Sequence, residues 1–323
     1  MGEADRPLTP VLVGPTGVGK TAVAEALAAR LPLTVISADA RQIYRGLDIG
    51  TAKPGPELRA RVPHLGIDLV GPGESYSAGR FARDAAGWLA EVRAAHRLPL
   101  VVGGTGLYIR ALVDGLFREP PLDPARRDQV RAWAEGLAGT ELSRWAGRLD
   151  RGFAGGGSQR AARAIEVALL TGRPLSYWQR AARETGVMRP WYIHLTLPRE
   201  TLQRRIERRV DEMLARGLVE EVRRVLAAGV APAAPGLDGV GYREVVAHLG
   251  GRLPGAQLRE AIVIATRQYA KRQRTWFRHQ LDQDVRRQTS DVRRDEVWAL
   301  DATESPDKLA DRVLERWNSI ADV

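Results

Sequence analysis

Residues 14–21 read GPTGVGKT and match the pattern G-x-x-x-x-G-K-[ST]. An apolar run, PVLVG, ends at Gly14, and the alanine-rich segment TAVAEALAARL begins at Thr21, so the motif lies between a predicted strand and a predicted helix. In that setting, backbone N–H groups point at phosphate oxygens beside a helix N-terminus, whose dipole also favours negative charge. The alternative is a glycine-rich turn that matches by chance. We predict a diphosphate or triphosphate site in which Lys20 adds positive charge and Thr21 offers a hydroxyl to Mg²⁺, formed by Gly14, Pro15, Thr16, Gly17, Val18, Gly19, Lys20 and Thr21.

The whole chain of 323 residues is long enough for one large domain or two ordinary ones. It has no apolar run of 18 residues, and its first ten residues carry acids and prolines where a signal peptide is apolar. We therefore expect a cytoplasmic protein without a membrane segment. Cysteine is absent, which excludes disulfides and thiolate metal sites.

The charge of the chain points to a polyanionic partner. The formal net charge is +10 and the pI is about 10.4. Residues 118–189 contain 13 arginines, no lysine and 8 acidic residues, so half of the excess positive charge lies in this segment.

Short apolar runs alternate with amphipathic segments between residues 8 and 113, which is typical of βαβ units and a parallel sheet. The expected strands are PVLVG, LTVIS, HLGIDLV and LPLVVGG. The alternation ends at REPPLDP (118–124), after which three helices follow without a strand. A strand returns at WYIHLTL (191–197), followed by one long helical run with an apolar stripe from Leu202 to Leu226. We predict an α/β fold, a P-loop NTPase-like parallel sheet flanked by helices with an inserted all-helical domain, divided as 1–117, 118–190 and 191–323.

An acid near the phosphate-binding loop is needed if the chain hydrolyses nucleotides. The run LPLVVGGTGLY ends in glycines and Thr105 without an acid, and Asp68 falls inside a predicted strand. Asp39 instead follows the run LTVIS, at the carboxyl edge where open α/β sheets bind ligands. The alternative role for Asp39 is an ordinary helix N-cap.

Five blocks together resemble the bacterial tRNA dimethylallyltransferase family. They occur in the family's order from residue 14 to about residue 281 and read GPTGVGKT, SADARQIYRGLDIGTAKP, PLVVGGTGLYIRALVDGL, QRAARAIEVALLTGRPLS, and GVGYREV followed by ATRQYAKRQRTWFRHQ. The resemblance implies transfer of a dimethylallyl group from dimethylallyl diphosphate to the exocyclic amine of an adenosine beside the tRNA anticodon, with release of pyrophosphate. The implied partners are dimethylallyl diphosphate and the anticodon stem-loop of tRNA. We expect a monomer that has no membrane partner.

The resemblance also implies roles for particular residues. Asp39 resembles the family's general base, because a weakly nucleophilic aromatic amine needs a group that takes its proton. Thr105 resembles the threonine that hydrogen-bonds near the same amine. Lys20, the loop amides and Mg²⁺ on Thr21 would stabilise the departing diphosphate. One of Arg205, Arg208 and Arg209 would close over it.

A flipped adenosine also needs protein contacts that hold the opened anticodon loop. The implied tRNA-binding residues are Asp39, Ala40, Arg41, Gln42, Thr105, Arg127, Gln159 and Arg160. For the arginines, a solvated surface position is the alternative. The segment RQYAKRQRTWFRHQ (267–280) would place arginines on phosphates and Trp276 in the core. The chain departs from the family at FAGGGSQR, where a His-Pro-Asn-Asp type turn usually stands.

Three other functions are compatible with parts of the sequence. A small-molecule P-loop kinase explains the loop but leaves the arginine-rich insert without a role. A nucleic-acid-dependent NTPase explains the charge but lacks its second-strand acid. An enzyme that prenylates free adenine nucleotides would not need so large a basic surface.

Overall fold

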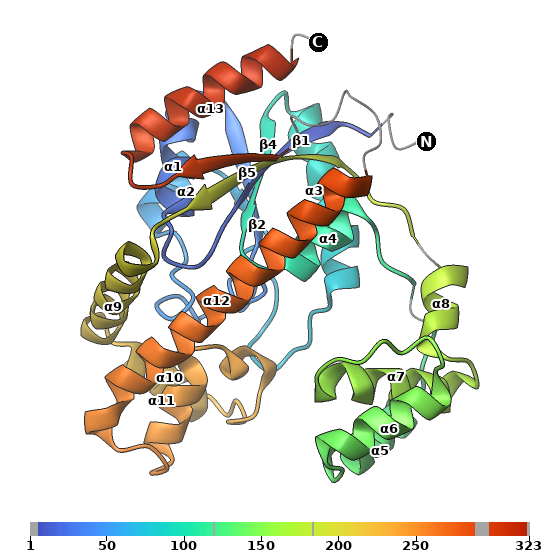
Figure 1. The fold of residues 1–323 in the computed structure, drawn as a ribbon. Coiled ribbons are helices and arrows are strands. Elements are labelled where there is room, and N and C mark those ends of the chain that lie inside the picture. Colours follow the sequence, from blue (N-terminus) through green and yellow to red (C-terminus); the bar gives the residue numbers. More distant parts are fainter. Residues whose placement is uncertain (1–5, 119, 183, 288–296, 322–323) are drawn as a thin grey trace. The chain divides into compact units, whose positions relative to one another are not determined.

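The computed structural model describes residues 6–321, apart from residues 119, 183 and 288–296 (Figure 1). The chain forms two compact units, which we call the α/β unit (Met1–Val113 with Val187–Val323) and the helical unit (Asp114–Gly186). The boundaries expected from sequence were 118 and 190. Strand β5 begins at Arg189, two residues before the expected Trp191.

The α/β unit is built on a six-stranded sheet in the order β3-β2-β4-β1-β5-β6, with every adjacent pair parallel. The strands are β1 (Leu8–Val13), β2 (Leu33–Ala38), β3 (His64–Leu65), β4 (Leu98–Gly103), β5 (Arg189–Thr196) and β6 (Val297–Asp301). The central strands are continuous apolar runs because helices cover both faces of the sheet. All six strands therefore end at one carboxyl edge, as the sequence predicted.

Helices α1 (Lys20–Ala28) and α13 (Pro306–Ala321) pack together on the sheet (Figure 1). Their apolar side chains form one core with the strands, which includes Leu27, Leu309, Leu12 and Leu195. The other helices along the first half of the unit are α2 (Pro56–Arg61), α3 (Ala78–Ala94) and α4 (Gly106–Val113). Among the described residues, no helix is long and apolar enough to cross a membrane.

The strand predicted for HLGIDLV is wrong beyond its first two residues. β3 ends at Leu65, Gly66 follows with φ 79°, and Asp68 has φ 57°, which no strand residue adopts. The Asp68 carboxylate instead binds the Lys53 ammonium at 2.6 Å and the Arg59 guanidinium at 2.8 Å. These ion pairs turn the chain away from the sheet edge.

The single long helix predicted after β5 is also wrong, because Gly217 interrupts it with φ 92°. The segment forms α9 (Arg199–Ala215) and α10 (Leu218–Ala227). The apolar stripe continues across the break into a second core, where Val210 and Val222 pack with residues of α11 (Tyr242–Leu249) and α12 (Gly255–Arg287). Helix α12 is the longest helix described and runs past the loops at the carboxyl edge (Figure 1).

The helical unit consists of α5 (Pro124–Glu135), α6 (Gly139–Leu149), α7 (Ser158–Thr171) and α8 (Leu175–Ala181). Its small core contains Leu142, Ala161 and Ile165. Helix α7 ends at Gly172 in the left-handed conformation, as the sequence predicted. The glycines of FAGGGSQR lie between α6 and α7, and Gly157 gives α7 no side-chain cap.

Candidate active site

The phosphate-binding loop connects the last residue of β1, Val13, to the first residue of α1, Lys20. Gly14 is required at the start of the loop, because a Cβ there would lie 2.7 Å from the Leu195 carbonyl oxygen on β5. The Lys20 ammonium crosses the loop and donates to the carbonyl oxygens of Gly14 (2.9 Å) and Pro15 (3.0 Å). Thr21 is exposed at the start of the helix, where its hydroxyl is accessible to a ligand.

Burial lowers the pKa of Lys20 to about 8. The negative charge of Asp39 opposes this shift, and the positive charge of Arg209 adds to it. An anionic ligand in the loop would relieve the unfavourable burial of this charge. The loop is therefore prepared for phosphate by its electrostatics as well as by its shape.

Asp39 and Thr105 meet at the neighbouring strand ends. Ala38 of β2 pairs with Gly103 of β4, so the residues that follow the two strands come together. The Ala40 N–H donates to the Thr105 hydroxyl at 2.9 Å, and the Thr105 N–H donates to the Ala38 carbonyl at 3.2 Å. Because β4 also pairs with β1, both residues share an edge with the phosphate-binding loop.

The Asp39 carboxylate is not a helix N-cap. Its Oδ1 accepts the backbone N–H of Arg41 at 2.9 Å, but the residues that follow form a turn and no α-helix. This hydrogen bond fixes the orientation of the carboxylate.

Two cavities adjoin Asp39. The smaller, of about 60 Å³, is lined by the phosphate-loop residues Lys20 and Thr21 together with Ser37, Asp39 and Gln42. The larger, of about 210 Å³, is lined by Asp39 with Thr16, Arg41, Arg209, Tyr269 and Arg272, among others. Asp39 therefore lies where a ligand in the phosphate loop and a ligand in the larger cavity would meet.

The structure distinguishes the three arginines of α9 that the sequence left open. Arg209 lines the larger cavity, where burial lowers its pKa and the carboxylates of Asp39 and Glu212 oppose that shift. Arg205 donates to the Val18 carbonyl of the phosphate loop at 3.0 Å. Arg208 is 75% exposed and pairs with Glu212 on the surface. Only Arg209 combines burial with proximity to both Lys20 and Asp39.

The predicted tRNA-binding residues near Asp39 make contacts within the protein. Arg41 donates to the Pro235 carbonyl at 2.8 Å and lies 3.7 Å from the Asp238 carboxylate. Gln42 accepts from the Ser37 hydroxyl at 2.7 Å, and its amide nitrogen donates to the Thr51 and Ala52 carbonyls. Gln42 thus ties the loop around Thr51 to the end of β2.

The predicted tRNA-binding residues of the helical unit differ in their surroundings. Arg127 forms an ion pair with Glu166 at 3.0 Å, and Arg131 and Arg163 bind the same carboxylate. Gln159 and Arg160 are exposed in the first turn of α7.

Helix α12 contributes residues that the sequence did not identify. Gln273 is buried and bridges the phosphate loop to Gly104, and Tyr269 lines the larger cavity. Burial raises the pKa of Tyr269 to about 12, whereas a hydrogen bond with the Thr105 side chain lowers it. Core packing was expected for the aromatic residues of this segment, Trp276 among them: Phe277 is fully buried, whereas Trp276 is only half-buried against Gly106. A sequence signal exists for Gln273, which is polar but falls on the apolar stripe of Ala270 and Phe277.

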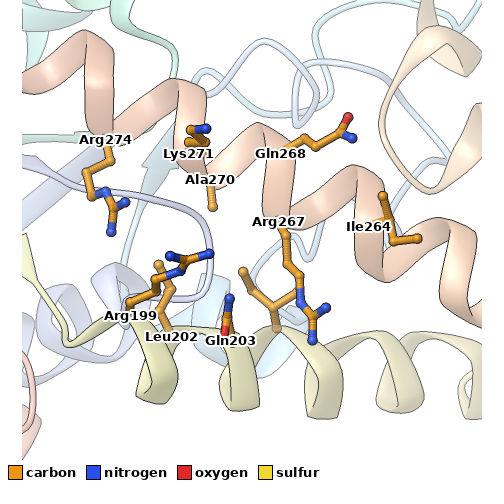
Figure 2. Close-up of a pocket in the computed structure, with 10 residues that line it drawn as sticks. Arg199, Leu202, Gln203, Ile264, Arg267, Gln268, Ala270, Lys271 and Arg274 are labelled. Atoms are coloured by element: carbon orange, nitrogen blue, oxygen red, sulfur yellow. The ribbon is translucent and has the colours of Figure 1, made fainter.

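A third cavity, of about 380 Å³, lies between α9 and α12 (Figure 2). Its floor is apolar and includes Leu202 and Ala270, and its rim is basic. Figure 2 shows Arg199 of α9 reaching toward α12, with Arg267 and Arg274 reaching from α12 toward α9. Arg267 is paired with Glu207.

Comparison with known proteins places the chain among a set of transferases. Residues 42–280 match the family described as IPP transferase, and residues 9–61 match isopentenyl transferase. The tRNA dimethylallyltransferase of Halorhodospira halophila is 46% identical over 278 residues, covering 84% of this chain and 90% of the relative. That of Bordetella petrii is 45% identical over 281 residues, covering 83% and 88%.

Solved structures also resemble this chain. The tRNA isopentenylpyrophosphate transferase of Bacillus halodurans is 30% identical, with a TM-score of 0.67 over 98% of this chain and 99% of that chain. A eukaryotic dimethylallyltransferase acting on tRNA is 23% identical, with a TM-score of 0.79 over 98% and 80%. The likeness to these structures confirms the predicted fold class.

Proposed function

This chain belongs to the IPP transferase family and is a tRNA prenyltransferase, and on that premise we propose how its residues carry out the transfer. The electrophile is dimethylallyl diphosphate, held by the phosphate-binding loop. The nucleophile is the exocyclic N6 amine of an adenosine beside the tRNA anticodon. The amine nitrogen bonds to the allylic carbon, the carbon–oxygen bond breaks with its electrons going to the diphosphate, and pyrophosphate leaves.

The position of Asp39 is the observation that carries this proposal. Asp39 lines both the small cavity beside Lys20 and the larger cavity beside Tyr269, so it adjoins the place where two ligands would react. As the new C–N bond forms, the amine loses a proton, and the Asp39 carboxylate accepts it. We assign the Thr105 hydroxyl, which accepts the Ala40 N–H, to orienting the same amine.

Negative charge builds on the diphosphate as it leaves. We propose that three groups stabilise this charge: the Lys20 ammonium, the N–H groups at the start of α1 and the Arg209 guanidinium. Their positions support this, because the positive charge of Arg209 lies close enough to lower the pKa of Lys20. Positive charges fixed before the reaction stabilise the transition state without reorganisation.

Mg²⁺ suits the donors beside the loop. Thr21 offers an exposed hydroxyl, and Ser37 and Asp39 place further oxygens in the same cavity. Mg²⁺ prefers oxygen ligands and usually keeps several waters and substrate phosphates, so a site with few protein ligands is adequate. When bound, the metal would neutralise charge on the departing diphosphate. We propose Thr21 as its protein ligand.

Contacts to tRNA are proposed for two surfaces. In the α/β unit these are Ala40 and Arg41 beside Asp39, Gln42, and the basic rim of the cavity between α9 and α12. Lys271 and Arg274 on that rim are exposed and have no acidic partner among the residues described. In the helical unit we propose Arg127, Gln159 and Arg160. The monomeric state and the cytoplasmic location remain predictions.

The test is incubation with labelled dimethylallyl diphosphate, unmodified tRNA and Mg²⁺, followed by digestion and nucleoside analysis. The expected product is a single prenylated adenosine. Free AMP and ATP serve as competing acceptors. Prenylation of the free nucleotides at an equal rate, or tRNA-stimulated ATP hydrolysis without prenyl transfer, contradicts the proposal.

A further inference from the structure

Gln273 uses both ends of its side-chain amide inside the protein. Its Oε1 accepts the backbone N–H of Thr16 at 2.8 Å, and its Nε2 donates to the Gly104 carbonyl at 2.9 Å. The residue is 6% exposed. A buried amide that is satisfied at both ends is held in one orientation, because losing either bond leaves an unpaired polar group.

These two hydrogen bonds connect the two halves of the active site. Thr16 belongs to the phosphate-binding loop. Gly104 immediately precedes Thr105, whose hydroxyl holds Ala40 beside Asp39. Because the Thr16 N–H donates to Gln273, it is not available to a phosphate. The backbone N–H groups that remain available are those after Thr16 in the loop.

The Gln273 amide lies directly against the backbone of Gly104. A Cβ on Gly104 would lie 2.1 Å from Nε2, closer than any real contact. One turn away on α12, Phe277 is fully buried. Because Phe277 anchors α12 close to Gln273, the helix determines where the Gln273 amide lies.

We propose that Gln273 is a positioning residue that sets the separation between the prenyl diphosphate and the amine. This inference rests on the proposed function. The loop carries the electrophilic carbon, and the end of β4 carries the residues that hold the nucleophile. An error of about 1 Å in such a separation costs about a hundredfold in rate. Gln273 therefore acts as a brace between the two parts, and its loss should slow the transfer step without weakening the binding of either substrate.

Gln273→Met tests the brace, because methionine has a similar volume but forms neither hydrogen bond. With both substrates saturating, we expect the single-turnover rate to fall by about tenfold to a hundredfold. The dissociation constants for dimethylallyl diphosphate and for tRNA, measured separately, should change by less than about threefold. Both roles lower the stability of the variant, because the Thr16 N–H and the Gly104 carbonyl lose their partner. A residue with only a structural role would also weaken both affinities in step with the rate.

The matched control is Gln257→Met. Gln257 is exposed in the first turn of the same helix, and its side chain makes no hydrogen bond among the residues described. Its transfer rate should remain within about twofold of wild type.

Gly104→Ala gives a second route that leaves Gln273 in place. The new methyl group would meet Nε2 at 2.1 Å and Cδ at 3.2 Å and displace the amide, while the nearest atom outside Gln273, the Gly14 carbonyl oxygen at 3.6 Å, is an ordinary contact. We expect a similar loss of rate, and no further loss when Gly104→Ala is combined with Gln273→Met. Additive losses would contradict a shared brace.

The inference is overturned if Gln273→Met transfers the prenyl group within twofold of wild type, or if its rate falls only as far as its substrate affinity does. Wild-type enzyme in the same assay separates the two proposals. An inactive wild type contradicts the proposed function, whereas an active wild type with an equally active variant overturns this inference alone.

Discussion

The Tyr242 hydroxyl donates a 2.7 Å hydrogen bond to the buried carboxylate of Glu221. The same carboxylate accepts the backbone N–H groups of Asp48 and Ile49 at 2.9 Å and that of Gly50 at 3.3 Å. Gly50 lines the larger active-site cavity, and a Cβ there would lie 2.5 Å from the Tyr242 ring. One wall of the active site is thus fixed by residues of α10 and α11.

Tyr242→Phe should lower the free energy of unfolding by about 1–3 kcal/mol, because it leaves a buried carboxylate with one bond fewer. Glu221→Ala should cost more, since three backbone N–H groups then lose their acceptor. Urea unfolding of both variants and of the double variant measures this. The second substitution should cost less in the presence of the first. Independent, additive effects would show that the two side chains are not coupled.

Asp39→Ala should abolish transfer while tRNA binding stays close to that of wild type. A general base typically contributes about a hundredfold to ten-thousandfold. Asp39→Asn is the companion variant, because it retains an oxygen for the Arg41 N–H and removes the basicity. Single-turnover transfer and tRNA binding are measured in parallel. A transfer rate within tenfold of wild type for both variants would falsify the role of Asp39.

The affinity for prenyl diphosphate should weaken as the pH rises above about 8. Lys20 has a pKa of about 8 in the free enzyme, so it is charged below that pH and loses its proton above it. A bound diphosphate favours the charged form, and binding must then take up a proton. We expect the dissociation constant to rise by up to about tenfold per pH unit above pH 8.

The control for this pH dependence is Lys20→Arg, whose guanidinium stays charged throughout the range. Its dissociation constant, whatever its absolute value, should stay flat between about pH 7.5 and 9.5. Calorimetry in two buffers of different ionisation enthalpy detects the proton uptake directly. A flat profile for the wild type contradicts the assignment of Lys20 to the diphosphate.

The α/β core could be predicted because its signals are local. GPTGVGKT lies between an apolar run and an alanine-rich helix, and each neighbouring strand is a continuous apolar segment that ends at one edge. Those facts place Lys20, Asp39 and Thr105 at a single edge without any knowledge of side-chain contacts. The family resemblance rests on the same ordered blocks and is confirmed.

The errors arose where long-range contacts decide local structure. Asp68 lies outside the sheet, where its carboxylate forms an ion pair with Lys53, and Lys53 also forms an ion pair with Asp48. The break at Gly217 is invisible in a stripe that continues on both sides of it. Gln273 differs in sequence from its polar neighbours only by falling on an apolar stripe, and only the fold brings Thr16 and Gly104, more than 160 residues away in sequence, to its two ends.

The arginines proposed for tRNA binding should be distinguishable by their salt dependence. Arg274 is exposed on the rim of the cavity between α9 and α12 (Figure 2), where a phosphate contact is expected, and Arg160 is exposed in the first turn of α7. Each phosphate contact releases counterions, so log affinity should fall with log salt concentration at a slope of about 0.7 to 0.9 per contact. Arg274→Ala should weaken tRNA binding and flatten that slope by about one unit or less. If Arg160 contacts a base of the opened loop, Arg160→Ala should weaken tRNA binding with little change in slope.

Arg208→Ala is the control for both substitutions, because that arginine is exposed but already paired with Glu212. If Arg274→Ala and Arg160→Ala both match the affinity and slope of this control, neither arginine contacts tRNA and both are ordinary surface residues.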